Sequence, residues 1–213
     1  METFTVWSDI GCPWATLALH TLHAAMAGSG TTLRIDHRAF PLELVNREPT
    51  PKVGHDAEVA AIGAVRPELN WTPWDRPDAT YPVTTLPALE AVQAAKRPEV
   101  GGLAASDELD TALRRAFFVE HRCISLHSVV EDVARQCPKV DADALMRLVR
   151  QGAGRAEIYA QLDTVQSEDV PGSPSIFAGD RLLGSNPGVT LEWVGPFPRI
   201  KAYDASWADE LCR

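Results

Sequence analysis

The stretch Ser8-Asp9-Ile10-Gly11-Cys12-Pro13-Trp14-Ala15 marks the passage from a predicted strand to a predicted helix. Residues 3–8 alternate β-branched and aromatic side chains, a pattern typical of a strand. Pro13 suits the first position of a helix, and strong helix formers follow it up to residue 27. The sequence therefore predicts that Cys12 lies in the turn where the first strand ends and the first helix begins.

Strand patterns recur at both ends of the chain. Residues 31–40 alternate again and predict a second strand, and a strand–helix–strand unit usually has parallel strands with a right-handed crossover. Residues 175–178 and 181–183 predict a hairpin. We therefore expect one discontinuous α/β domain made of residues 1–45 and 168–213.

The middle of the chain, residues 46–167, has helical periodicity and predicts an all-helical insertion lobe. The expected helices cover residues 57–65, 83–96, 107–120, 125–137, 142–151 and 155–167. Apart from its one helix, the segment of residues 41–81 is rich in proline, charge and tryptophan, which predicts an irregular surface segment. The tail after residue 184 predicts only a short helix near 204–211. A lobe inserted in this way usually leaves a cleft in which ligands bind.

Composition and charge narrow the classes of function. The net charge of −9 and the pI of about 5.1 disfavour a nucleic-acid partner. No apolar run approaches the ~18 residues of a membrane span. The N-terminus also lacks the basic region and cleavage site of a signal peptide. We expect a cytoplasmic protein, monomer or homodimer, with no membrane or nucleic-acid partner.

The four cysteines, Cys12, Cys123, Cys137 and Cys212, are spaced too widely for a disulfide framework or a zinc module. In a reducing cytoplasm each is expected to be a thiol, either a small buried side chain or a chemical centre. Cys12 is the candidate catalytic residue, because a helix N-terminus offers unpaired backbone N–H groups and the positive end of the helix dipole. Both favour a thiolate with a pKa below the usual ~8.5, whereas Asp9 nearby opposes it.

Four segments, in the same order along the chain, resemble the DsbA-like thioredoxin-fold family, particularly its FrnE-like branch and the related 2-hydroxychromene-2-carboxylate isomerases. They are residues 8–15, His37-Arg38-Ala39-Phe40-Pro41-Leu42-Glu43-Leu44, Leu113-Arg114-Arg115-Ala116-Phe117-Phe118-Val119-Glu120 and Val170-Pro171-Gly172-Ser173-Pro174-Ser175-Ile176-Phe177. The resemblance covers most of the chain. It implies an α/β thioredoxin-like fold that is interrupted by the all-helical insertion lobe.

The resemblance also implies which residues surround Cys12. Pro174 matches the family's cis-proline, which faces the reactive cysteine and leaves the backbone of Ser173 free to pair with a substrate chain. Pro171 is a rival for this role, but no strand pattern follows it directly. The expected substrate-binding residues are Pro13, Trp14, Ser173 and Pro174.

The chain departs from the family at Ala15, where the Cys-Pro-Trp-Cys motif has its second cysteine. That cysteine resolves a mixed disulfide within the enzyme. Here the release of Cys12 requires either a low-molecular-weight thiol, such as glutathione, or a distant cysteine, with Cys212 ranked before Cys123. The leading hypothesis is a monothiol thiol–disulfide oxidoreductase for protein or small-molecule disulfides, with no tightly bound cofactor.

Two alternatives stay open. Kappa-type glutathione transferases and hydroxychromene carboxylate isomerases resemble the chain in fold and insertion, and they activate a bound thiol. They usually carry serine at the position of Cys12. The cysteine of this chain therefore favours a thiol–disulfide redox reaction. The second alternative is a non-catalytic relative that binds a partner.

Other polar and aromatic residues give weaker indications. His20 and His23 lie three residues apart but have no third ligand, so no metal site is expected. His121 and His127 flank Cys123 without sharing a helical face. Cys137 precedes a proline at a predicted helix end and is interpreted as structural. The aromatic residues that either line a ligand cleft or anchor their own segment are Trp71, Trp74 and Tyr81.

Overall fold

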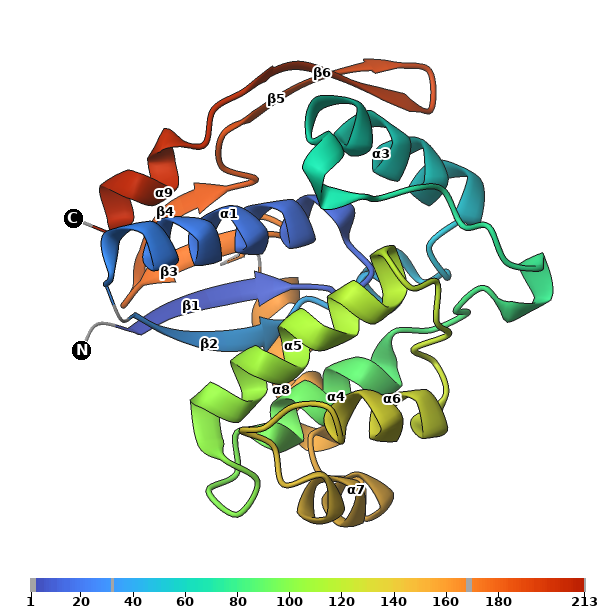
Figure 1. Cartoon of the computed structure of the whole chain (residues 1–213), viewed down its shortest axis with the longest axis vertical. Helices are drawn as coiled ribbons and strands as arrows, with labels where there is room; N and C mark the ends of the chain where they lie inside the picture. Colours follow the sequence, from blue (N-terminus) through green and yellow to red (C-terminus); the bar gives the residue numbers. More distant parts are fainter. Residues whose placement is uncertain (1–2, 32, 168–169, 213) are drawn as a thin grey trace.

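The computed structural model of the chain describes residues 3–31, 33–167 and 170–212. Strand β1 (Thr3–Ser8) leads into helix α1 (Pro13–Ser29) and then into strand β2 (Arg34–Ala39). β1 and β2 are parallel, with Ser8 opposite Ala39. The predicted strand–helix–strand unit is therefore confirmed, and Figure 1 shows α1 running alongside the sheet.

The central sheet has four strands in the order β2-β1-β3-β4. β3 (Ser175–Ala178) and β4 (Arg181–Ser185) form the predicted hairpin. β3 is antiparallel to β1, with Trp7 opposite Ser175. Since β1 ends where β3 begins, this pairing places the residues that precede β3 beside the turn that carries Cys12.

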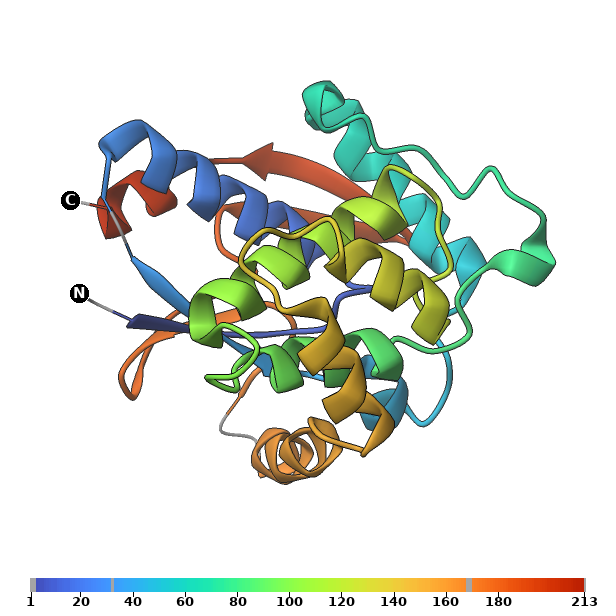
Figure 2. The same cartoon turned by 60° about the horizontal axis from the view of Figure 1, so that its bottom comes forward.

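Helices occupy the chain between β2 and β3, as predicted for the insertion. They are α2 (Leu42–Asn46), α3 (Lys52–Val65), α4 (Leu86–Ala95), α5 (Gly102–Phe118), α6 (His127–Ala134), α7 (Ala142–Arg150) and α8 (Arg155–Gln166). Asp141 caps α7, because its carboxylate accepts a hydrogen bond of 2.9 Å from the backbone N–H of Ala144. Figures 1 and 2 show α4, α6, α7 and α8 gathered on the side of α5 that faces away from α1.

The segment of residues 41–81 is more regular and more buried than predicted. α3 begins at Lys52, and two short 3-10 turns, Pro67–Leu69 and Asp78–Thr80, follow it. Trp71 and Trp74 are each 8% exposed, and the Trp71 ring stacks on Phe118 with centroids 4.9 Å apart. The prediction of an irregular surface segment is wrong, because two buried tryptophans, each covering roughly 150–250 Å², anchor this segment to α5.

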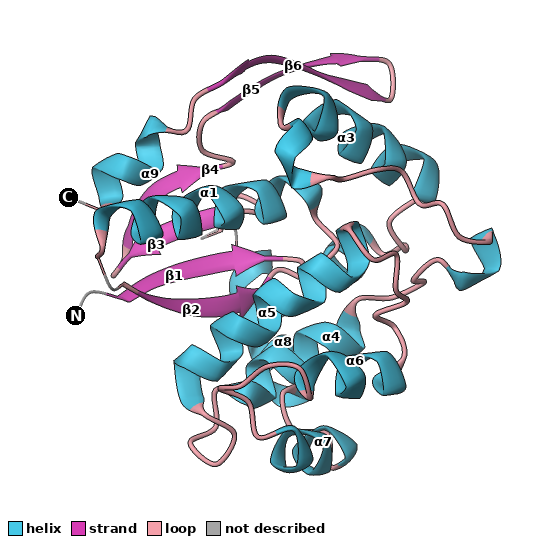
Figure 3. Cartoon of the chain, viewed as in Figure 1, coloured by secondary structure: helices cyan, strands magenta, loops and turns pink. Residues whose placement is uncertain are grey.

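A second hairpin near the C-terminus is also absent from the prediction. β5 (Val189–Val194) and β6 (Phe197–Tyr203) form a separate two-stranded sheet, and β6 packs against α3 (Figures 1 and 3). Pro198 within β6 argues against a strand, but a two-stranded sheet has only edges, where proline is tolerated. The predicted last helix is present as α9 (Ser206–Leu211).

Two apolar clusters hold α1. One cluster packs α1 on the sheet and contains Phe4, Val6, Leu19, Leu22, Ile35, Ile176 and Cys212. The other joins Ile10, Cys12 and Trp14 to side chains of α3 and α5, among them Val59, Ile62, Leu113 and Phe117. The turn that carries Cys12 is therefore part of the core that the sheet shares with the helical segment.

Candidate active site

Cys12 occupies the N-cap position of α1, and Pro13 begins the helix. The Cys12 backbone is extended, with φ −80° and ψ 115°, and its carbonyl accepts the N–H of Thr16 at 3.1 Å. The Cys12 side chain makes no capping bond to the helix. The thiol is therefore free to point away from the helix that follows it.

The Cys12 thiol meets the segment that precedes β3. Sγ donates to the carbonyl oxygen of Ser173 at 3.3 Å, and the peptide bond between Ser173 and Pro174 is cis. In return the Ser173 hydroxyl accepts the backbone N–H of Asp9 at 3.0 Å. The structure thus brings Cys12, Ser173 and Pro174 together, as the sequence resemblance implies. Pro171 lies outside this contact and is exposed.

The predicted low pKa of Cys12 is wrong for this state of the protein. Cys12 is 4% exposed, and burial raises the pKa of its thiol to about 11. The Ser173 side chain and the backbone N–H of Ala15 favour the thiolate and lower that pKa, whereas the negative charges of Glu58 and Asp9 raise it further. Desolvation of the thiolate outweighs the helix N-terminus here, because apolar side chains of the helical segment cover the turn.

Asp9 fixes the turn from within. It is 2% exposed, and its Oδ1 accepts the N–H of Gly11 at 2.8 Å. Its Oδ2 accepts the N–H of Leu42 at 2.9 Å and the hydroxyl of Thr85 at 3.1 Å. Burial raises the pKa of this carboxyl despite these bonds. Asp9 therefore ties the turn to the segments that begin α2 and α4.

Arg114 of α5 clamps the same turn from the other side. Its guanidinium is 3% exposed and forms an ion pair with Asp110, with hydrogen bonds of 2.7 and 3.1 Å. It also donates to the carbonyl of Asp9 at 3.0 Å and to the hydroxyls of Thr16 and Ser8, each at 2.9 Å. The sequence resemblance identifies the helix, but no local pattern shows that Arg114 reaches the cysteine turn.

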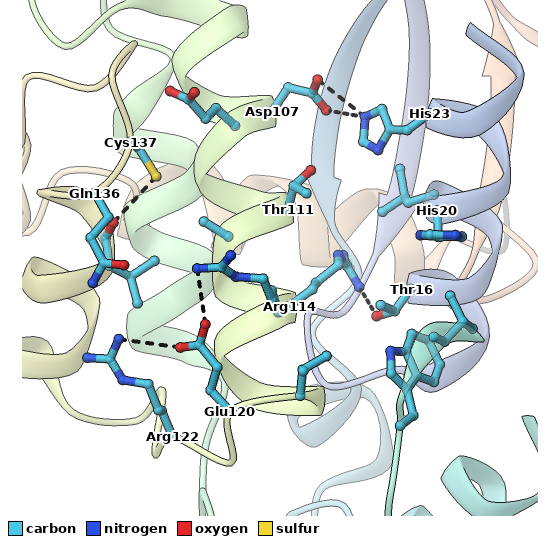
Figure 4. A pocket seen from close by; sticks show the side chains of 18 of the residues that line it. Thr16, His20, His23, Asp107, Thr111, Arg114, Glu120, Arg122, Gln136 and Cys137 are labelled. Carbon is cyan, nitrogen blue, oxygen red and sulfur yellow. Dashed lines mark hydrogen bonds and ion pairs between the residues drawn. The ribbon is translucent and has the colours of Figure 1, made fainter. Parts of the chain in front are cut away.

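A cavity of about 620 Å³ lies along α5, where α1 forms one wall and the α6 region the other. Figure 4 shows Arg114 pointing toward Thr16, and His23 facing Asp107 at 3.0 Å. Cys12 does not line this cavity. His20 and His23 line it, but within the described part of the chain no group of three or more His, Cys, Asp or Glu side chains is placed to hold a metal ion.

The other predicted substrate-binding residues, Pro13 and Trp14, are buried. Trp14 is 6% exposed and belongs to the same apolar cluster as Val59 and Ile62 of α3. Pro13 and Trp14 therefore pack the site in this state rather than line an open surface. A disulfide substrate reaches Cys12 only after some side chain around the thiol moves.

The structure does not bring the two candidate resolving thiols to Cys12. Cys212 is 6% exposed in the cluster beneath α1, and its carbonyl accepts the Thr31 hydroxyl at 2.9 Å, beyond the C-terminal end of α1. At ~1.5 Å per residue, the length of α1 places it roughly 25 Å from Cys12. Cys123 lies half-buried between α5 and α6, and none of its described bonds reaches the site. In this conformation Cys212 lies too far from Cys12 to attack a disulfide on it, and Cys123 has no described hydrogen bond to the site.

Among the remaining aromatic and sulfur candidates, Trp71 and Cys137 line the cavity along α5, whereas Trp74 and Tyr81 do not. Cys137 is buried, and burial raises the pKa of its thiol to about 11. His121 contacts Asp75 at 2.5 Å instead of forming a pair with Cys123. Tyr81 packs edge-on against Trp74 with centroids 5.4 Å apart, which anchors its segment.

Comparison with known structures agrees with the fold. Cytosolic disulfide reductase DsbM from Pseudomonas aeruginosa, in a structure with GSH, superposes with a TM-score of 0.65 at 18% identity, covering 98% of this chain and 96% of that one. A 2-hydroxychromene-2-carboxylate isomerase superposes with a TM-score of 0.60 at 15% identity, covering 86% of this chain and 89% of that one. At such identities these likenesses show the fold.

No curated protein matches the sequence. No helix among the described residues is long and apolar enough to cross a membrane. The model of the DSBA-like thioredoxin domain matches residues 3–193, which include β1, the Cys12 turn, the whole helical segment and the central hairpin. The chain belongs to the DSBA-like thioredoxin domain family.

Proposed function

We propose that this chain is a thiol–disulfide oxidoreductase that works through Cys12 alone, on protein or small-molecule disulfides. The observation that carries the proposal is the 3.3 Å contact between Cys12 Sγ and the Ser173 carbonyl, next to the cis bond to Pro174. The family resemblance implies that a substrate chain pairs with the backbone at this position. A substrate held there brings its disulfide to the thiol.

The exchange proceeds in two steps. The Cys12 thiol loses its proton, and the thiolate attacks one sulfur of the substrate disulfide; the S–S bond breaks, and the released sulfur leaves as a thiolate that takes up a proton. An external thiol then attacks the mixed disulfide on Cys12, which returns as a thiol while the external thiol is oxidised. Electrons thus pass from the external thiol to the substrate disulfide.

An external thiol is required because Ala15 stands at the position of the second motif cysteine and Cys212 lies at the far end of α1. We propose a low-molecular-weight thiol such as glutathione, which binds transiently. The DsbM structure with GSH supports this class of thiol. We also propose a cytoplasmic location, where such thiols are abundant, a monomer or homodimer, and a thioredoxin-like domain of residues 1–45 and 168–213 around the 46–167 lobe.

The pKa of Cys12, raised to about 11, favours a second candidate function. In a transferase or isomerase of the kappa glutathione transferase and hydroxychromene carboxylate isomerase type, Cys12 would stay a neutral thiol. It would donate a hydrogen bond to the sulfur of a bound thiol cofactor, as it now donates to Ser173. Such an enzyme needs no resolving cysteine.

Reduction of a mixed disulfide substrate by glutathione separates the two functions. The oxidoreductase should show turnover that requires added glutathione and disappears in Cys12→Ser. Its rate should rise about tenfold per pH unit between pH 7 and 10, since the thiolate fraction rises by that factor below the pKa of about 11. Exchange that persists in Cys12→Ser contradicts the site assignment. No exchange, with turnover of an aromatic substrate by Cys12→Ser, supports the second function.

A further inference from the structure

The cavity along α5 has the size of a small-molecule site, and the proposed function gives it no role. Its volume of about 620 Å³ falls within the roughly 300–1,000 Å³ of ligand pockets in proteins. Helices α1 and α5, the segment of residues 68–71 and the end of α6 line it. Cys12 does not line it, so a ligand bound here would occupy a site separate from the candidate active site.

The inner wall of the cavity is apolar and includes one aromatic ring. Leu19, Leu69, Trp71 and Val133 line it, and each is at most 8% exposed. The Trp71 ring is held in place by Phe118 of α5, on which it stacks at an interplanar angle of 23°. The wall is therefore already formed without a ligand, and a flat apolar molecule can bury its surface against it.

The indole N–H of Trp71 is an unused hydrogen-bond donor at this wall. Within the part of the chain that the structure describes, this N–H has no partner. The unpaired indole N–H groups of Trp74 and Trp207 are fully enclosed by protein, whereas that of Trp71 is not. Since a buried tryptophan usually finds an acceptor for its N–H, we expect a ligand in the cavity to supply one.

The charged side chains around the cavity are matched in pairs. The ion pairs that include lining residues are His23 with Asp107, Arg114 with Asp110, Arg115 with Glu120, Arg122 with Asp132 and Glu68 with Arg66. Glu108 accepts the backbone N–H of Lys139 at 2.7 Å, which sets an acidic residue beside a basic one. Burial lowers the pKa of His20, whose imidazole is therefore neutral at pH 7. A charged ligand would have to compete with an existing pair, so the cavity favours an uncharged one.

We propose that this cavity binds an uncharged, flat aromatic ketone or aldehyde whose carbonyl oxygen accepts the Trp71 indole N–H. The aromatic ring of the ligand lies against the apolar wall. Figure 4 shows Thr111 on α5 and His20 on α1, on either side of the cavity, where they can bind a second polar group of the ligand. The site goes beyond the proposed function and does not depend on disulfide exchange at Cys12.

The test uses four naphthalene probes of similar shape. They are 2-acetylnaphthalene, its hydrocarbon analogue 2-isopropenylnaphthalene, 2-naphthoate and 2-naphthylmethylammonium, and ligand-observed NMR gives the dissociation constant of each. The ketone should bind most tightly. The hydrocarbon should bind about threefold to tenfold more weakly, because it lacks the acceptor for one neutral hydrogen bond. The two ions should bind at least about tenfold more weakly, because each brings an unmatched charge.

Three variants locate the probe in the cavity. Trp71→Phe removes the donor and keeps a ring that can stack on Phe118, so the ketone should fall to the affinity of the hydrocarbon while the hydrocarbon is unchanged. A merely structural loss would weaken both. Trp193→Phe is the matched control, because Trp193 is 54% exposed on β5 and does not line the cavity. Ala112→Trp fills the cavity from α5 and should weaken all four probes.

Several results would overturn the proposal. They are no detectable binding of the ketone, equal affinity of wild type for ketone and hydrocarbon, and tighter binding of either ion. Loss of ketone binding in Cys12→Ser would also overturn it, because the ligand would then lie at the candidate active site. The comparison of ketone with hydrocarbon uses wild type alone and decides the matter even if Trp71→Phe does not fold. Because no step needs turnover at Cys12, a failure of the proposed function leaves this test intact.

Discussion

Replacement of Arg114 by methionine tests how α5 holds the cysteine turn. Methionine keeps much of the length and apolar volume of the side chain but removes the charge and every donor. In wild type the guanidinium is 3% exposed, pairs with Asp110 and donates to the carbonyl of Asp9 and the hydroxyl of Thr16. Arg114→Met should therefore destabilise the whole fold and not only the turn.

The size of the effect follows from the burial of the pair. Asp110 is also 3% exposed at its side chain, so Arg114→Met leaves a buried carboxylate without its cation. Breaking a buried ion pair by removing one partner costs about 3–5 kcal/mol. The orphaned Asp9 carbonyl adds to this by about 1–3 kcal/mol if no water replaces the guanidinium. We expect a loss of at least about 4 kcal/mol in the free energy of unfolding, measured by urea denaturation with tryptophan fluorescence. At a slope of about 2 kcal/mol per M, the midpoint falls by at least about 2 M.

Arg115→Met is the matched control, because the neighbouring Arg115 is 63% exposed at its side chain and pairs with Glu120 at 3.0 Å on the surface. It should cost less than about 1 kcal/mol. The double variant Asp110→Asn, Arg114→Met should regain a large part of the loss, since no charge is then left buried. A cost for Arg114→Met within 1 kcal/mol of the control, or no recovery in the double variant, would refute the reasoning.

Three further predictions concern pH and the cysteines. Burial alone would lower the pKa of His23, but the hydrogen bond and ion pair with Asp107 raise that pKa. Burial alone would raise the pKa of Asp107, but the two histidines bound to it hold that pKa well below its usual range. The stability that the His23 interaction contributes is present below pH ~6.5 and is lost as pH rises through the folded pKa of His23, whereas the contribution of Asp107 is lost as pH falls below ~3.9. Urea denaturation at pH 5.5 and 8.5 should therefore show that the free energy of unfolding falls more between these pH values in wild type than in Asp107→Asn. Ala15→Cys should make a single reduction cycle independent of added glutathione, although a larger side chain at this fully buried position should cost about 1–3 kcal/mol in thermal melts. Cys212→Ser should leave glutathione-dependent turnover unchanged, and a loss of turnover would show that Cys212 reaches Cys12.

The local features of the site could be predicted from the sequence. A strand pattern, Cys12 and Pro13 at a helix start, and Pro174 before a second strand are properties of short stretches, and the backbone places them as those stretches indicate. The parallel pairing of β1 and β2 follows from the same local rules.

The predictions that failed concern features that depend on packing between segments distant in the sequence. The helix N-terminus lowers the pKa of Cys12, and this is visible in the sequence, but the larger effect of burial comes from side chains more than forty residues away, such as Trp71 and Phe117. Arg114 and Glu58 act on the turn across 102 and 46 positions of the chain, so no spacing motif reveals them. The β5–β6 hairpin was missed for a similar reason, because its strands gain support from α3.

The anchors around Cys12 also determine which part of the site moves when a substrate binds. The backbone of the turn is held by Arg114 at the Asp9 carbonyl, by Ser173 at the Asp9 N–H and by the Asp9 carboxylate itself. Moving the turn would break all of these bonds in a buried place. Releasing the thiol breaks its bond to the Ser173 carbonyl, at a net cost of roughly 0.5–1.5 kcal/mol, and gives up its interactions with the Ser173 side chain and the Ala15 backbone. We therefore infer that Cys12 is presented by rotation of its side chain within a fixed turn. A substrate backbone that pairs at Ser173 would favour that rotation, because it takes over the carbonyl that the thiol now occupies.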